Sequence, residues 1–275
     1  MHHRERKLLN RESISPRCIC RANCLKTVFS YDQAPVGETQ FDLSTEYNRD
    51  VLRCDLCGHF VTHHDMDVSS LYTSQYVSST YGDDGLRSAY DRIMGLDPIT
   101  SDNVARVQNL ISYTADSGFG VGKTLLDVGS GLCVFPSAMK KAGWDCTVVD
   151  PDSRAIAHAQ DVVGVKAVCG DYMEIEGLGE FDVVTFNKVL EHVEDPVNML
   201  YRASEHLKRK GFVYIEVPDG EAAALDGPGR EEFFIEHWHV FSPASLAALV
   251  SQAGLSLNIM ENRVFLFKPK IININ

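Results

Sequence analysis

Two carboxylates and two glycines in the middle of the chain could bind a ligand together. One carboxylate and both glycines lie in the segment LLDVGSGLC, which ends at Cys133. Asp127 lies within an apolar run, and Gly129 and Gly131 follow it. Because glycine lacks a Cβ, the backbone there can turn sharply and approach a ligand closely. The next apolar run ends at Asp150, where a carboxylate can accept hydrogen bonds from both hydroxyls of a ribose. The pattern predicts a site for a nucleoside-containing cofactor.

Two residues of this loop disfavour a dinucleotide. The dinucleotide fingerprint requires a third glycine for close packing of helix and strand, and Val134 occupies that position. Asp127 would repel a pyrophosphate, whereas it would attract the ammonium group of an amino-acid tail. The order D-x-G-x-G, followed by an acid at the end of the next strand, resembles motif I of the class I S-adenosylmethionine-dependent methyltransferases. Cys133 stands where that family usually has a third small residue.

This resemblance implies that S-adenosylmethionine is the cofactor. In the family, an acidic position corresponding to Asp171 lies beside the adenine amine, and the neighbouring side chain, here Tyr172, covers the ring. The backbone after the fourth strand runs beside the sulfonium, which points to Asn187. The cofactor-binding residues implied in this way are Asp127, Gly129, Ser130, Gly131, Asp150, Asp171, Tyr172 and Asn187.

The elements that would position these residues alternate between strands and helices. Asp195 with Pro196, and Ser242 with Pro243, have the order of a helix cap followed by a first helical residue. Such alternation predicts the α/β class, with a doubly wound, mainly parallel Rossmann-like sheet whose ligand lies at the carboxyl ends of the strands. Beyond the glycine loop, helices are expected over 103–114, 153–163, from 196, and over 243–253, and strands over 165–169, 181–187, from 211, 255–260 and 264–267.

Five of the eight cysteines precede residue 60, and they predict a structural zinc site. Cys54 and Cys57 have the C-x-x-C spacing of half a zinc knuckle. Cys20 and Cys24 are the preferred second pair, and Cys18 is a spare thiol or a replacement. His59, His63 and His64 could substitute as ligands. Disulfides are the rival interpretation, although a cytoplasmic protein disfavours them.

The order of the parts resembles a narrower group, the sugar methyltransferases with a zinc-binding N-terminal domain, which include nucleotide-sugar C-methyltransferases. In that group the tyrosine and the last histidine of a Y-H-E-H segment are implicated in removing a proton beside the sugar keto group. The matching positions here end in Glu236 and His237, whereas Phe234 lacks the tyrosine hydroxyl. Both O- and C-methylation stay open, and the group's third domain has no counterpart in this sequence.

The resemblance makes His237 the first candidate for the catalytic base, since a neutral imidazole accepts protons near pH 7. Glu236 would orient His237 or bind a substrate hydroxyl. His239 and His192 are the next candidates. Glu191 and His192, in the segment LEHVEDP, also have a purely structural interpretation at the start of a helix.

The amino-acid composition limits the kinds of partner that the protein is expected to bind. A net charge of −12 disfavours broad binding to the nucleic-acid backbone, and no apolar stretch is long enough to cross a bilayer. We expect a cytoplasmic protein that binds a small-molecule acceptor, a sugar or sugar nucleotide. Three parts are predicted: residues 1–69 as a zinc-binding N-terminal lobe, 70–122 as a helical linker or lid, and 123–275 as the S-adenosylmethionine-binding methyltransferase domain.

Three functions compete at this point. The first is a methyltransferase that acts in carbohydrate biosynthesis. The second is a methyltransferase for another small molecule, a quinone or natural product, because the LEHVEDP segment occurs widely in such enzymes. The third is a scaffold protein that holds zinc and the cofactor without turnover.

Overall fold

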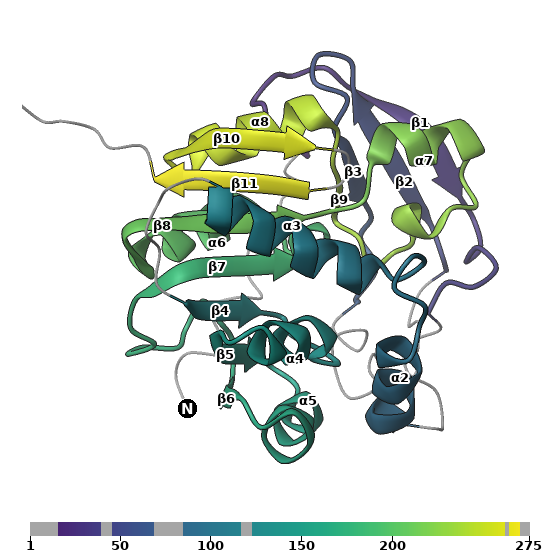
Figure 1. Ribbon diagram of the computed structural model, residues 1–275. Coiled ribbons are helices and arrows are strands. Elements are labelled where there is room, and N and C mark those ends of the chain that lie inside the picture. The colour runs from purple at the N-terminus through teal and green to yellow at the C-terminus, as the bar shows by residue number, and fades with distance from the viewer. Residues whose placement is uncertain (1–15, 40–45, 69–84, 117–122, 262–263, 270–275) are drawn as a thin grey trace, which may run out of the picture.

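The computed structural model describes residues 16–39, 46–68, 85–116, 123–261 and 264–269, with their side chains except at residue 116 and beyond residue 258. Residues 70–84 and 117–122 of the predicted lid lie outside the described residues, as do residues 1–15, 40–45 and 69 of the predicted N-terminal lobe. Two sheets organise the described chain, a large one with helices on both faces and a small one at its side (Figure 1).

The large sheet has the strand order β10-β11-β8-β7-β4-β5-β6. Five neighbouring strands pair in parallel, and β11 and β10 extend the sheet in antiparallel pairing. The α/β class and the mainly parallel sheet are therefore confirmed. The strands are β4 (Thr124–Val128), β5 (Asp145–Asp150), β6 (Lys166–Cys169), β7 (Phe181–Asn187), β8 (Leu207–Glu216), β10 (Leu255–Glu261) and β11 (Val264–Pro269).

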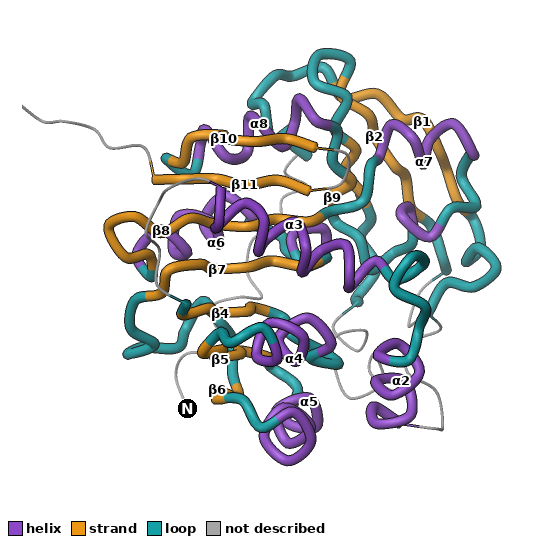
Figure 2. The backbone as a smooth tube through the Cα atoms, in the orientation of Figure 1, coloured by secondary structure: helices purple, strands orange, loops and turns teal. Residues whose placement is uncertain are grey.

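Helices cover both faces of this sheet, so its central strands are apolar on both sides. On one face lie α3 (Asp102–Asp116), α4 (Val134–Lys141) and α5 (Ser153–His158), and on the other lie α6 (Pro196–Glu205) and α8 (Pro243–Gln252) (Figures 1 and 2). A π-helical turn, Ala159–Val163, continues α5 to Gly164. The remaining helices are α2 (Gly85–Met94) and α7 (Gly220–Asp226).

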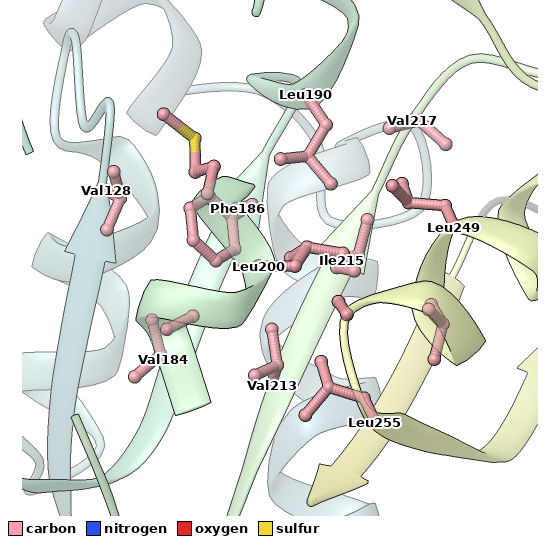
Figure 3. Close-up of a cluster of buried hydrophobic side chains, with 14 of the residues drawn as sticks. Val128, Val184, Phe186, Leu190, Leu200, Val213, Ile215, Val217, Leu249 and Leu255 are labelled. Carbon is pink, nitrogen blue, oxygen red and sulfur yellow. The ribbon is translucent and has the colours of Figure 1, made fainter. Parts of the chain in front are cut away.

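Consecutive residues of one strand enter opposite cores. Val183 packs with the α3 and α4 side, whereas Val184 packs with α6 and α8. Figure 3 shows the second core, where Leu200 of α6 and Leu249 of α8 lie over β7 and β8. This packing holds the carboxyl ends of β4, β5 and β7 in fixed relation.

The predicted helix caps are confirmed. The Asp195 carboxylate accepts a hydrogen bond from the amide of Asn198, and Ser242 and Ser245 form a capping box at α8. Strand β8 begins four residues before the expected start at Gly211. Gly211 lies inside the strand, where a side chain would not fit, because a Cβ there would come within 2.9 Å of the carbonyl oxygen of Asp182.

The small sheet is antiparallel and contains β1 (Leu25–Tyr31), β2 (Arg49–Cys54), β3 (Phe60–His63) and β9 (His239–Val240). Its first three strands belong to the described residues 16–39 and 46–68, which we call the cysteine lobe. Strand β9 comes from the C-terminal half of the chain, and it follows directly on the segment Glu236–Trp238 (Figure 1). The cysteine lobe is thus built into one sheet with the segment predicted to act on the acceptor.

A buried ion pair reinforces this junction. Arg49 donates to Glu38 at 2.7 Å, and both side chains are fully buried. Tyr47 donates to the second oxygen of Glu38, and the same carboxylate accepts the amide of Ile235 at 2.7 Å. In the part of the chain that the structure describes, every helix is too short or too polar to cross a membrane.

Candidate functional site

The glycine loop joins β4 to α4 in a backbone conformation that favours glycine. Gly129 and Gly131 have φ angles of 69° and 46°, and Cys133, which precedes α4, has a φ of 55°. A Cβ at Gly129 would come within 2.7 Å of Val189 Cγ2, in the loop after β7. Glycine is required at this position both by its φ angle and by the close approach of that loop.

Asp150 lies at the carboxyl end of β5 and forms a hydrogen bond with the glycine loop. Its Oδ2 accepts the amide of Gly131 at 2.9 Å, and its Oδ1 accepts the amide of Asp152 at 2.9 Å. Burial raises the pKa of the Asp150 carboxyl. The structure therefore brings the two halves of the predicted cofactor site, the loop and the acid after it, into direct contact.

Asp127 is 2% exposed and lies beneath the loop. Its Oδ1 accepts hydrogen bonds from Thr185 at 2.5 Å and from Asn187 Nδ2 at 2.9 Å, and burial raises its pKa to about 6. Asn187 Oδ1 and Ser130 Oγ are buried and find no hydrogen-bond partner among the described residues. Buried polar atoms are normally paired, so these two oxygens fit a ligand that brings donors, such as an ammonium group.

Asp171 and Tyr172 lie after β6, in different surroundings. Asp171 is exposed, and its carboxylate accepts the amide of Met173 at 2.9 Å. The Tyr172 ring is 3% exposed and packs edge-on against Phe186, with the Arg202 guanidinium 5.5 Å from the ring centroid. Tyr172 is a core residue here, whereas Asp171 is accessible to a ligand.

An ion pair that sequence reasoning missed links α3 to the end of β8. Arg106 donates to both oxygens of Glu216, at 2.6 and 2.5 Å, and both side chains are about nine-tenths buried. Asn103, one turn earlier on α3, has a buried Oδ1 that no described residue contacts by a hydrogen bond. The only hint in the sequence was an arginine placed within an amphipathic helix.

Glu191, His192 and His237 meet at the carboxyl end of β7, and we call them the acceptor-side cluster. One potential ligand atom from each residue lies within 4.8 Å of those of the other two, and the two imidazole centroids are 4.6 Å apart. Burial lowers the pKa of His192 to about 3 and that of His237 to about 4, so both rings are neutral at pH 7. Burial raises the pKa of the Glu191 carboxyl to about 8.

Glu236 and His239, the other two predicted catalytic residues, have different surroundings. Burial raises the pKa of Glu236 to about 7. His239 lies on the far side, with its Nδ1 3.0 Å from Nε2 of the fully buried His59 and its Nε2 3.3 Å from the carbonyl of Glu194. His239 thus contacts the cysteine lobe, whereas His192 and His237 contact each other.

The N-terminal cysteines converge as well. The sulfurs of Cys18, Cys20, Cys54 and Cys57 all lie within 4.8 Å of one another, and neighbouring pairs are 3.3 to 3.6 Å apart. Cys24, a predicted ligand, is 3.4 Å from Cys54 but does not belong to that group of four. The ligands of a tetrahedral zinc ion with Zn–S bonds of about 2.3 Å would be about 3.8 Å apart, so the four sulfurs are close to that arrangement.

Comparison with known proteins agrees with the fold and the glycine loop. A family described as a methyltransferase domain matches residues 101–258, more than half of the chain. The chain therefore belongs to this methyltransferase family, and it carries an S-adenosylmethionine-dependent methyltransferase domain. The matched segment runs from the start of α3 into β10 and includes both the glycine loop and the acceptor-side cluster.

Two curated relatives are named ubiquinone biosynthesis O-methyltransferases. The relative from Bordetella avium is 29% identical over 49% of this chain and 62% of its own length. The relative from Caulobacter vibrioides is 32% identical over 38% of this chain and 44% of its own. This chain therefore spans about half the length of these relatives. Among solved structures, the CcbJ methyltransferase from Streptomyces caelestis matches 66% of this chain with a TM-score of 0.51 and 14% identity, which supports the fold.

Proposed function

We propose that the protein transfers the methyl group of S-adenosylmethionine to a hydroxyl oxygen of a small molecule. The observation that carries this proposal is the hydrogen bond from the Gly131 amide to the Asp150 carboxylate, which joins the glycine loop to the predicted ribose acceptor. Asp150 would bind the ribose hydroxyls. Asp127, Ser130 and Asn187 would bind the amino-acid tail, and Asp171 the adenine amine.

The acceptor-side cluster would receive the acceptor. It follows directly on β7, whose last residue, Asn187, belongs to the cofactor site. Holding donor and acceptor in line can supply a large part of the rate enhancement of such a displacement. Loss of the hydroxyl proton is promoted by this cluster, in which His237 is the residue that the sequence also singles out. Glu236 is next to His237 in the chain. His239 would anchor the same segment through its contact with His59 of the cysteine lobe.

The favoured acceptor is a ring hydroxyl of a quinone precursor. The two relatives described above carry names from ubiquinone biosynthesis, and they support this class over the sugar expected from the sequence. A sugar hydroxyl is the second candidate, supported by the cysteine lobe and by the order Glu236-His237 in the C-terminal segment.

Methyl transfer is tested by the release of S-adenosylhomocysteine from the purified protein with an alkylated dihydroxybenzoate or with a nucleotide sugar. We expect turnover with the phenolic acceptor, reduced by about 100-fold in His237→Gln because proton removal typically contributes that much or more. The control is His206→Gln, since His206 lies at the opposite end of the sheet, hydrogen-bonded to the carbonyl of Gly179. Turnover with the nucleotide sugar alone would favour the second acceptor, and cofactor binding without any turnover would favour a scaffold protein.

We also propose that the cysteine lobe holds one structural zinc ion. The sulfur positions favour Cys18, Cys20, Cys54 and Cys57 as the ligands and replace Cys24 by Cys18 in the set expected from the sequence. Four protein ligands leave no position for water or substrate, so such a site stabilises the fold and does no chemistry.

Metal analysis of the purified protein is expected to give at least about one zinc per chain, the ion held by the cysteine lobe. Cys18→Ser should lose most of this zinc, and Cys24→Ser should keep it, because only Cys24 lies outside the group of four sulfurs. The two variants make the same chemical change six residues apart. Loss of zinc from Cys24→Ser, with retention in Cys18→Ser, would contradict the ligand set and restore the one predicted from the sequence.

A further inference from the structure

We propose that Glu191, His192 and His237 bind one divalent transition-metal cation, which in turn binds the hydroxyl oxygen of the acceptor. This inference deepens the proposed function, because the role of the cation toward the acceptor rests on methyl transfer, whereas the binding of the cation does not. Two histidines and one carboxylate are the protein ligands of several metal sites that keep open positions for water or substrate.

The hydrogen bonds of the two imidazoles support this assignment. Nδ1 of His192 lies 3.0 Å from the carbonyl oxygen of Glu236, and Nδ1 of His237 lies 2.9 Å from that of Glu232. A carbonyl oxygen can only accept, so each Nδ1 carries the proton, and in a neutral ring the lone pair is then on Nε2. Histidines that bind metals almost always donate their second nitrogen to a carbonyl or carboxylate in this way.

Glu191 supplies the oxygen ligand that such a site requires. The side chain is 2% exposed, and its Oε2 is buried without a hydrogen-bond partner among the described residues. Bonds of about 2.1 Å to each ligand would hold the three ligand atoms roughly 3.0 to 3.5 Å apart. One ring nitrogen of each histidine and one carboxylate oxygen already lie within 4.8 Å of one another, so side-chain rotations would complete the site.

The cation would change how the acceptor loses its proton. A hydroxyl bound to a divalent cation is far more acidic than a free one. Its O–H bond breaks and the proton goes to water, after which the oxygen attacks the methyl carbon. The carbon–sulfur bond breaks with its electron pair remaining on sulfur, and S-adenosylhomocysteine leaves. His237 then acts through the cation rather than as a free base.

Lys188 opposes this site. The residue is exposed, it follows β7 directly, and its charge acts on both Glu191 and His237. A positive charge that acts on two of the ligands also repels a bound cation, so removal of the charge should tighten cation binding. This expectation is specific to a metal site, since a merely structural cluster would not respond in this way.

The test uses Mn²⁺, a divalent cation suited to carboxylate and water ligands, which competes poorly for the thiolates of the cysteine lobe. Free Mn²⁺ is followed by electron paramagnetic resonance in a titration of the full-length protein without cofactor or acceptor. We expect one ion per chain, a loss of at least about 100-fold in affinity in His192→Gln and in Glu191→Gln, and a gain of about three- to tenfold in Lys188→Gln. His206→Gln is the matched control and should bind as the wild type does.

Absence of Mn²⁺ binding by the wild type, or binding that survives both ligand substitutions, would overturn the proposal. Lys188→Gln keeps the test decisive if the buried substitutions prevent folding, because Lys188 is exposed; unchanged affinity in this variant would also count against the site. The titration involves no S-adenosylmethionine, so a negative result would leave the methyltransferase proposal standing, with His237 as a direct base.

Discussion

Gly129→Ala is expected to weaken binding of S-adenosylmethionine by about 30-fold or more, equivalent to about 2 kcal/mol. It should also lower the free energy of unfolding by about 2 to 4 kcal/mol, because a left-handed residue with a Cβ is strained and the added methyl overpacks the loop. The Cβ would meet Val189 Cγ2 at 2.7 Å, so the glycine loop and the loop after β7 must move apart. Calorimetric titration and chemical denaturation measure the two effects.

Two further variants separate strain from collision. Gly177 has a φ of 74°, and no heavy atom of the described residues lies within 4 Å of a Cβ built there. Gly177→Ala should therefore cost about 1 kcal/mol of stability and leave cofactor affinity unchanged. The double variant Gly129→Ala/Val189→Ala should regain part of the affinity. Equal effects of Gly129→Ala and Gly177→Ala would refute the collision between the two loops.

Arg49→Met is expected to lower the free energy of unfolding by about 3 to 5 kcal/mol, since it leaves a buried carboxylate without its partner. Glu38 is 4% exposed and also accepts the amide of Ile235. The substitution should therefore loosen the C-terminal segment that carries Glu236 and His237 and reduce turnover along with stability. Denaturation curves and the rate of S-adenosylhomocysteine release measure these changes.

An exposed ion pair provides the control for this substitution. Arg87 and Asp91 pair at 3.0 Å on α2 with both side chains more than half exposed, so Arg87→Met should change stability by less than about 0.5 kcal/mol. The double variant Arg49→Met/Glu38→Gln should recover part of the loss, because it removes the uncompensated charge. A cost for Arg49→Met no larger than that for Arg87→Met would show that the buried pair does not hold the junction.

Local patterns predicted much of the fold. Asp195 and Ser242 cap their helices as expected, because a cap depends on residues within one turn of the chain. The strand over 181–187 was recognisable because a strand covered on both faces is apolar throughout. The start of β8 was misplaced since Gly211, a breaker in isolation, fits inside the strand through its close contact with neighbouring carbonyls.

Local sequence patterns could not predict the contacts between residues far apart in the chain. Strand β9 has two residues and owes its existence to pairing with β3, nearly 180 positions earlier, which no local pattern encodes. The same holds for Arg106 with Glu216, separated by 110 positions. At the site, the motif alone identifies Asp150 and the glycine loop. The sequence favours a structural role for Glu191, because its proximity to His237 depends on how the C-terminal segment folds back.

Titration of the purified protein with S-adenosylmethionine, followed by calorimetry and with NAD as the control ligand, shows whether the glycine loop and Asp150 form the cofactor site. The expected result is one S-adenosylmethionine per chain, no binding of NAD, and a loss of about 100-fold in affinity in Asp150→Ala, which removes both ribose hydrogen bonds. Binding of NAD in preference to S-adenosylmethionine, or equal affinity in Asp150→Ala, would contradict it.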